Sequence, residues 1–139
     1  MIIDTNVLVA ALRSVNGASF RLLKLLENND NRFEINVSTS IILEYEAVLK
    51  REVHRQGKRI GIIDRFIDDI ISKANRCQIF YLLRPYLEDG DDDFILELAF
   101  SSSADFIITY NSSNFKKAKA FGVDVITPKA FLHKIGEIP

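Results

Sequence analysis

Polar side chains that could do chemistry follow the first apolar residues of the chain, in the stretch Ile2-Ile3-Asp4-Thr5-Asn6. Ile2 and Ile3 are typical of a short buried strand. A carboxylate where a buried strand stops is costly unless it has a partner. We therefore interpret Asp4 as part of a site rather than as part of the core.

Two later stretches carry carboxylates that could meet Asp4. In Ser38–Glu46, both Glu44 and Glu46 flank an apolar helical stripe, and periodicity alone does not choose between them. The second stretch is the acidic run Glu88–Asp93. Clustered carboxylates repel one another, and oxygen-bound Mg²⁺ or Mn²⁺ is a common compensation. We predict that the three stretches meet around such an ion, which can activate water and bridge to a phosphate.

The acidic run also has interpretations other than a metal site. Asp89, Asp91 and Asp93 match the start of a calcium loop. However, Phe94 and Phe100 stand where that loop needs glycine and glutamate, which excludes it. A solvated loop with a charged helix start stays open as an alternative.

Two classes of phosphate-handling protein are further alternatives. The chain has no glycine-rich phosphate loop, which argues against a nucleotide-triphosphate enzyme. A phosphoacceptor domain stays open, because acids at strand ends suit it and Lys129 follows a predicted late strand.

Apolar patterns predict strands that alternate with helical segments. The predicted strands are residues 2–3, 33–37, 77–83, 106–109 and 123–127. The predicted helical segments are residues 7–12, 20–26, 41–49, 63–74 and 95–102, a lysine-rich piece at 116–119, and a last helix that Pro128 opens. This alternation favours a parallel sheet covered on both faces, whose site lies beyond the carboxyl ends of the strands. Asp4, Ser38, the acidic run and Asn111 all fall at such ends.

The bulk properties fit a single domain over residues 1–139, with 47% apolar residues and a net charge of −1. A net charge of −1 argues against a surface that binds polyanions in general. RNA would therefore have to be bound by a local basic patch or through a metal. The stretch Lys50–Arg59, with Arg51 and Arg55, is either a solvated helix end or such a patch.

The single cysteine, Cys77, excludes an internal disulfide and is expected to be a core thiol. The chain shows no signal peptide and no apolar run that approaches the ~20 residues of a membrane span. We expect a cytoplasmic protein.

In the order and spacing of its motifs, the chain resembles a PIN domain, close to the toxin-like (VapC-type) branch of bacterial and archaeal toxin–antitoxin systems. The matching stretches are Ile3–Asn6, Ser38–Leu49 with Glu44, Asp91–Asp93, Ala104–Thr109, and Thr127-Pro128 with Phe131-Leu132. The resemblance implies a three-layer α/β/α sandwich with a mainly parallel five-stranded sheet. It also implies a ribonuclease whose acids hold Mg²⁺ or Mn²⁺.

The resemblance assigns the acids residue by residue. Asp4 matches the first acid, Glu44 rather than Glu46 the second, and Asp93 the third, since Leu96 and Ala99 follow it as in the family pattern. The residues implied to support these acids are Thr5, Asn6, Asp92 and Thr109.

The fourth acid of the family is replaced here by Asn111, and Asn114 stands where an aspartate often compensates. An amide oxygen can bind a metal but adds no charge. The resemblance thus implies a metal-dependent endoribonuclease, with an RNA substrate, a small antitoxin partner and a homodimer. The alternative is a catalytically weak or inactive PIN-fold module that binds protein or RNA.

Overall fold

Parallel strands form the centre of the molecule. The computed structural model of the chain describes residues 1–57, 60–78 and 93–139. Strands β1 (Ile2–Ile3), β4 (Phe106–Ile108) and β5 (Asp124–Ile126) form a parallel sheet in the order β1-β4-β5. Strand β2 (Asn36–Val37) pairs in parallel with β3 (Asn75–Arg76).

Met1 joins these two ladders. Its amino nitrogen donates a hydrogen bond to the Glu34 carbonyl at 2.7 Å, and its own carbonyl accepts one from the Asn36 nitrogen at 2.9 Å. The strands therefore follow the order β3-β2-β1-β4-β5, with all observed pairings parallel. In place of the single five-stranded sheet that was expected, the described residues form a three-stranded sheet and a two-stranded sheet, which meet at Met1.

The helices begin near the positions that the sequence indicates. They are α1 (Thr5–Arg13), α2 (Ala18–Glu27), α3 (Thr39–Arg55), α4 (Ile60–Lys73), α5 (Asp93–Ser101) and α6 (Pro128–Lys134), with the 3₁₀ turns η2 (Ser112–Phe115) and η3 (Ala118–Phe121). The Ser38 hydroxyl caps α3 by accepting a hydrogen bond from Ile41 N at 3.3 Å. Thr127 caps α6 in the same way, through Ala130 N at 3.1 Å, and Pro128 takes the first helical position.

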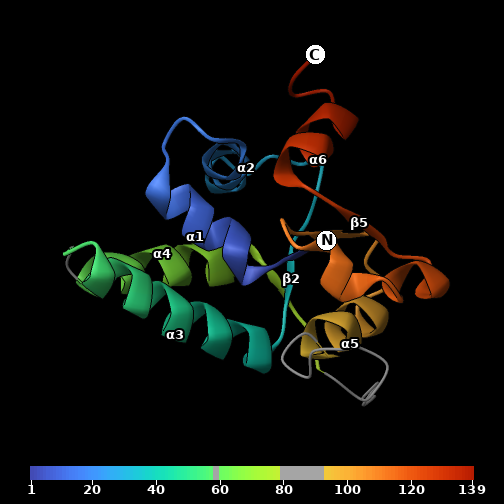
Figure 1. Cartoon of the computed structure of the whole chain (residues 1–139), viewed down its shortest axis with the longest axis horizontal. Helices are drawn as coiled ribbons and strands as arrows, with labels where there is room; N and C mark the ends of the chain where they lie inside the picture. Colours follow the sequence, from blue (N-terminus) through green and yellow to red (C-terminus); the bar gives the residue numbers. More distant parts are fainter. Residues whose placement is uncertain (58–59, 79–92) are drawn as a thin grey trace.

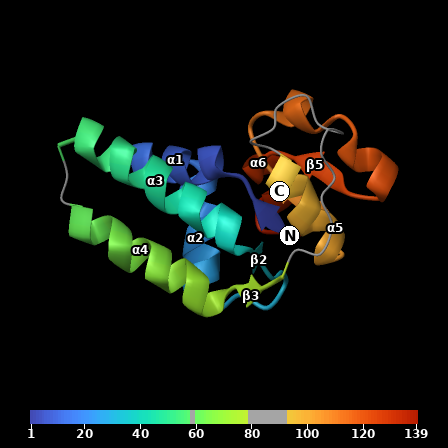
Figure 2. The ribbon, with the colours of Figure 1, turned by 90° about the horizontal axis from the view of Figure 1, so that it is seen from below.

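Helices cover both faces of the sheet (Figure 1). Helix α6 lies on one face, where Phe131 packs edge-to-face against Phe106 of β4 with ring centroids 5.7 Å apart. Helix α5 lies on the opposite face and contacts β1 and β2. Helices α1, α2, α3 and α4 pack together beside the sheet (Figure 2). This arrangement is the predicted α/β/α architecture.

The central strands supply the core. Ile2, Ile107 and Ile108 are completely buried. A fully buried isoleucine contributes about 1.5–3 kcal/mol to folding. This burial holds β1 and β4 side by side, and so sets the distance between the residues that follow them.

Two predicted strands differ from the observed ones. Alternation over residues 33–37 predicts a longer strand, but only Asn36–Val37 pairs, because its partner β3 is itself two residues long. The strand predicted at 77–83 is replaced, in the described part, by Asn75–Arg76, which pairs directly after α4. Residues 79–83 lie outside the described ranges. Cys77 is half-buried rather than a core thiol.

Candidate active site at the strand ends

Asp4 lies at the junction between β1 and α1. Its backbone nitrogen continues the sheet by donating to the Ile108 carbonyl at 2.9 Å, and its carbonyl accepts from Val7 N in the first turn of α1. Its Oδ1 atom accepts from Thr5 N at 2.7 Å, which caps α1. Asp4 is 8% exposed. The carboxylate therefore sits at a helix N-terminus, where the helix dipole favours negative charge.

Thr109, directly after β4, holds the other oxygen of the carboxylate. Its hydroxyl donates to Asp4 Oδ2 at 2.7 Å. The same hydroxyl oxygen accepts from Asn6 Nδ2 at 3.2 Å and from Asn111 N at 3.0 Å. A hydroxyl has one hydrogen and two lone pairs. Because both lone pairs are taken, its hydrogen is directed at Asp4.

Glu44 of α3 joins this group through Thr5. The Thr5 hydroxyl donates to Glu44 Oε2 at 2.6 Å, while Thr5 N donates to Asp4. Glu46 instead pairs with Lys50 one turn later, at 2.7 Å. Of the two glutamates that periodicity leaves open, Glu44 is the one at the strand ends.

Tyr45 fixes α3 against β1. It is 1% exposed, and its hydroxyl donates to the Ile3 carbonyl. Burial raises the pKa of Tyr45 well above its usual value, and the negative charges of Asp4 and Glu44 raise it further. Tyr45 thus stays a neutral hydrogen-bond donor to the last residue of β1.

The electrostatics of Asp4 favour a cation. Burial raises the pKa of the Asp4 carboxyl, and the hydrogen bonds from Thr109 and Thr5 partly oppose that rise. Each carboxylate oxygen accepts one of these hydrogen bonds and keeps a lone pair for another partner. Carboxylate, hydroxyl and amide oxygens are the ligands that Mg²⁺ and Mn²⁺ prefer. The donor set around Asp4 therefore fits a hard divalent cation.

Of the remaining predicted residues, Asn111 is fully described by the structure, whereas Asp93 is described only in its backbone and Asp92 not at all. Asn111 is exposed, and its Oδ1 accepts from the Ser113 hydroxyl at 3.3 Å, while its backbone nitrogen reaches Thr109. Asp93 is the first residue of α5, as predicted, but its side chain and all of Asp92 lie outside the description. The described side chains contain no group of three histidine, cysteine or acidic residues that could hold a metal by themselves.

A family profile described as PIN domain matches residues 1–113. The chain belongs to the PIN domain family. The match runs from β1 to η2 and contains Asp4, Glu44, Asp93 and Thr109. PIN domains are generally nucleases and typically depend on divalent metals. Comparison with curated proteins and with solved structures found no match.

Helix α5 of this PIN domain carries a buried acid that the sequence analysis did not single out. Glu97 is 3% exposed and lies one turn after Asp93, so both residues start from the same face of the helix. The sequence could have indicated Glu97, because it follows Asp93 by four residues in an otherwise apolar segment.

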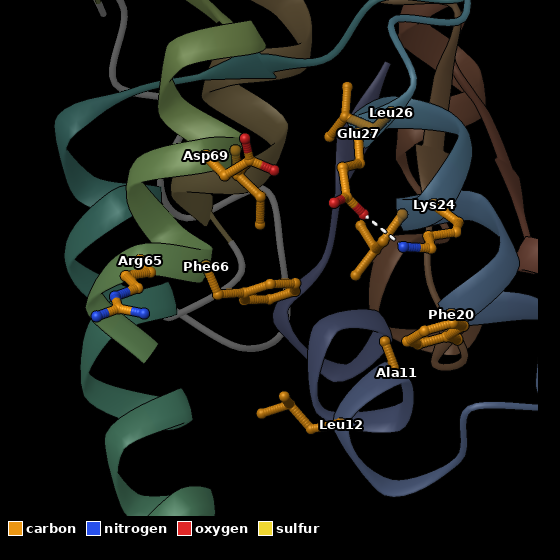
Figure 3. Close-up of a pocket in the computed structure, with 11 residues that line it drawn as sticks. Ala11, Leu12, Phe20, Lys24, Leu26, Glu27, Arg65, Phe66 and Asp69 are labelled. Atoms are coloured by element: carbon orange, nitrogen blue, oxygen red, sulfur yellow. Dashed lines mark hydrogen bonds and ion pairs between the residues drawn. The ribbon is translucent and has the colours of Figure 1, made fainter. Parts of the chain in front are cut away.

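A separate hollow of about 500 Å³ lies between α1, α2 and α4 (Figure 3). Apolar side chains such as Leu12 and Phe66 line it, and Lys24 and Glu27 form an ion pair of 3.0 Å at its wall. None of the acids or hydroxyls of the candidate site lines this hollow. This hollow is therefore separate from the candidate site at the strand ends.

Arg51 and Arg55 are exposed on α3, the helix that carries Glu44. They follow Glu44 by seven and eleven residues, so the three residues lie on one stripe of the helix. With a rise of 1.5 Å per residue, they start ~10 Å and ~16 Å further along its axis.

No helix in the described ranges is long and apolar enough to cross a membrane.

Proposed function

We propose that this PIN domain is a metal-dependent endoribonuclease that hydrolyses phosphodiester bonds of RNA. The observation that supports this proposal is the buried Asp4 carboxylate at the end of β1. Thr109 holds this carboxylate, and Thr5 links it to Glu44. An acid held in this way is a pre-organised anionic ligand for a cation.

Asp4, Glu44 and Asp93 are the residues that would hold Mg²⁺ or Mn²⁺, with Asn111 contributing an amide oxygen. When bound, the metal supplies activation of water and neutralisation of phosphate charge. The hydrogen bonds of the protein itself position the two acids. Thr109 and Thr5 N hold the two oxygens of Asp4, and the Thr5 hydroxyl orients Glu44.

The basic stripe on α3 offers a path for the rest of the substrate. Arg51 and Arg55 extend from Glu44 along one face of the helix, and we propose that they contact phosphates of the bound RNA. The net charge of −1 means that such contacts must come from local clusters.

We further propose that the protein acts as the toxin of a toxin–antitoxin pair, as a cytoplasmic homodimer with a small antitoxin protein. The family resemblance supports this role. An antitoxin that presents a cationic side chain to Asp4 and Glu44 would satisfy the same charge as the metal.

The alternative is a PIN-fold module that binds RNA or protein with weak or absent turnover. Asn111 favours it, because the amide adds no charge where relatives have an acid. It predicts RNA binding without cleavage in the presence of Mn²⁺.

The test is cleavage of a labelled single-stranded RNA pool with Mn²⁺, with and without EDTA. We expect wild-type cleavage that EDTA abolishes, and a loss of at least about 100-fold in Asp4→Asn, Glu44→Gln and Asp93→Asn, because each removes a metal-holding charge. Mn²⁺ should also raise the melting temperature of the wild type but not of Asp4→Asn.

Glu46→Gln is the matched control, since Glu46 lies on the same helix but pairs with Lys50. Binding of RNA by every variant without any cleavage would favour the alternative. Cleavage that persists in both Asp4→Asn and Glu44→Gln would contradict the proposed site.

Expression of the wild type, but not of Asp4→Asn, should arrest growth if the protein is a toxin.

A further inference from the structure

Tyr110 is an exposed aromatic residue at the edge of the acidic site. It follows Thr109, whose hydroxyl holds Asp4, and the residue is 50% exposed. A single exposed aromatic residue is common on protein surfaces, so the exposure of Tyr110 by itself identifies no site. A role for Tyr110 is supported by its contacts and by its position next to Thr109.

Both ends of Tyr110 are held in place. Its hydroxyl forms a hydrogen bond of 2.6 Å with the hydroxyl of Ser19, which is 1% exposed in α2. Its backbone nitrogen donates to Asn6 Oδ1 at 3.3 Å. The ring is thus fixed while much of its surface stays open to solvent. A ligand that stacks on it would need to immobilise few additional bonds.

The hydrogen bonds also place Tyr110 relative to the acids. They connect, in order, Glu44, Thr5, Asp4, Thr109, Asn6, Tyr110 and Ser19. Asp4 lies near the middle of this series, between Glu44 and Tyr110. Tyr110 is thus joined to the acids through Asn6 and Thr109, and its ring hydroxyl reaches Ser19 of α2.

We propose that the open face of Tyr110 is a stacking site for a nucleobase of single-stranded RNA. Every base has a flat π-face, and stacking on a tyrosine is a common way to hold unpaired RNA. A base stacked there would place its nucleotide beside the acidic site and orient the adjoining phosphate toward Asp4. This inference rests on the proposed nuclease function and adds a substrate-positioning residue to it.

The test measures binding separately from cleavage. In an Asp4→Asn background, which prevents turnover, the affinity for a short labelled oligoribonucleotide is compared with Tyr110→Ala and Tyr110→Phe added. We expect Tyr110→Ala to weaken binding about fivefold or more, and Tyr110→Phe to stay within about twofold, because phenylalanine keeps the stacking face.

A direct signal is available because the chain contains no tryptophan. Tyr110→Trp introduces the only tryptophan of the chain, which can be excited selectively over the tyrosines, and its emission should be quenched when RNA binds. Phe100→Trp is the matched control, since Phe100 is 42% exposed and packs against Phe121 near the far end of α5. Its emission should not respond to RNA.

Equal RNA affinity of Tyr110→Ala and its parent would overturn the inference. So would equal weakening by Tyr110→Phe and Tyr110→Ala with a lowered melting temperature, which would mark Tyr110 as a structural link to Ser19. If Tyr110→Ala instead changes only the oligomeric state, the ring is a protein contact. Cleavage by the wild type, measured separately, shows whether the nuclease function stands in each of these cases.

Discussion

At the residue scale, the site depends on one hydroxyl with three partners. Thr109 is completely buried and bonds to Asp4, Asn6 and the backbone of Asn111. It therefore joins the end of β1 to the segment after β4. Asn111 reaches the site through its backbone nitrogen, so part of its structural role does not depend on having an acidic side chain.

Thr109→Val should show what this hydroxyl contributes. Valine has the same shape but leaves the Asp4 oxygen and the Asn111 nitrogen without this partner, so we expect a loss of about 1–3 kcal/mol in the free energy of unfolding. The pKa of Asp4 should rise further, because the Thr109 hydrogen bond lowers it. Urea unfolding and metal-dependent cleavage measure the two effects.

Thr109→Ser is the control for this change, since serine keeps the hydroxyl and loses only a methyl group. It should retain more cleavage activity than Thr109→Val. A valine variant as stable and as active as the wild type would show that Asp4 is held by other contacts.

At the element scale, α3 combines three roles in one helix. Tyr45 docks it on β1, Glu44 faces the strand ends, and the exposed Arg51 and Arg55 continue the Glu44 stripe. Side chains of one helix keep a fixed spacing along its axis. A substrate that follows α3 would therefore meet the acid first and the two cations afterwards.

Charge reversal of Arg51 and Arg55 to glutamate tests this path. If the guanidinium groups contact phosphates, RNA affinity should fall and the dependence of log affinity on log salt should become shallower by about one to two. Fluorescence anisotropy at several salt concentrations measures both quantities.

The matched control reverses Arg65 and Arg76, which are exposed on α4 and β3, and changes the net charge by the same amount. It should leave RNA binding close to that of the parent. Equal losses in both double variants would indicate a general charge effect, and a change in stability alone would mean that the stripe is a solvated helix end.

At the scale of the whole molecule, an ion pair joins α1 to α3. Glu52 accepts hydrogen bonds from Arg13 at 2.6 and 3.0 Å, and from Gln56 at 2.8 Å. The bonds from Arg13 and Gln56 lower the pKa of Glu52 from 4.5 to about 2. The two helices that begin beside the site are thus held together near their other ends.

This shift predicts how stability depends on pH. Because the folded pKa lies below the unfolded value, the pair stabilises the fold above the unfolded value, and this contribution is lost as the pH falls through the folded one. Between about pH 5 and pH 2, the free energy of unfolding should fall more steeply for the wild type than for Glu52→Gln. Urea unfolding at several pH values provides the comparison, and parallel curves would contradict the prediction.

The sequence by itself determined most of the local elements. Apolar patterns located β1, β4, β5 and the six helices, because each of these is specified by residues close to one another in the chain. The position of Asp4 after β1, and of Asp93 at the start of α5, followed from the same patterns. The lengths of β2 and β3 did not, since a strand extends only as far as its partner.

The tertiary structure alone decided which side chains meet. Glu44 and Glu46 are about 200° apart around a helix, so the docking of Tyr45 on β1 turns one toward Thr5 and leaves the other to Lys50. The contact between Ser19 and Tyr110 joins residues that no periodic pattern relates. Such pairings depend on how whole elements pack, which no short stretch of sequence specifies.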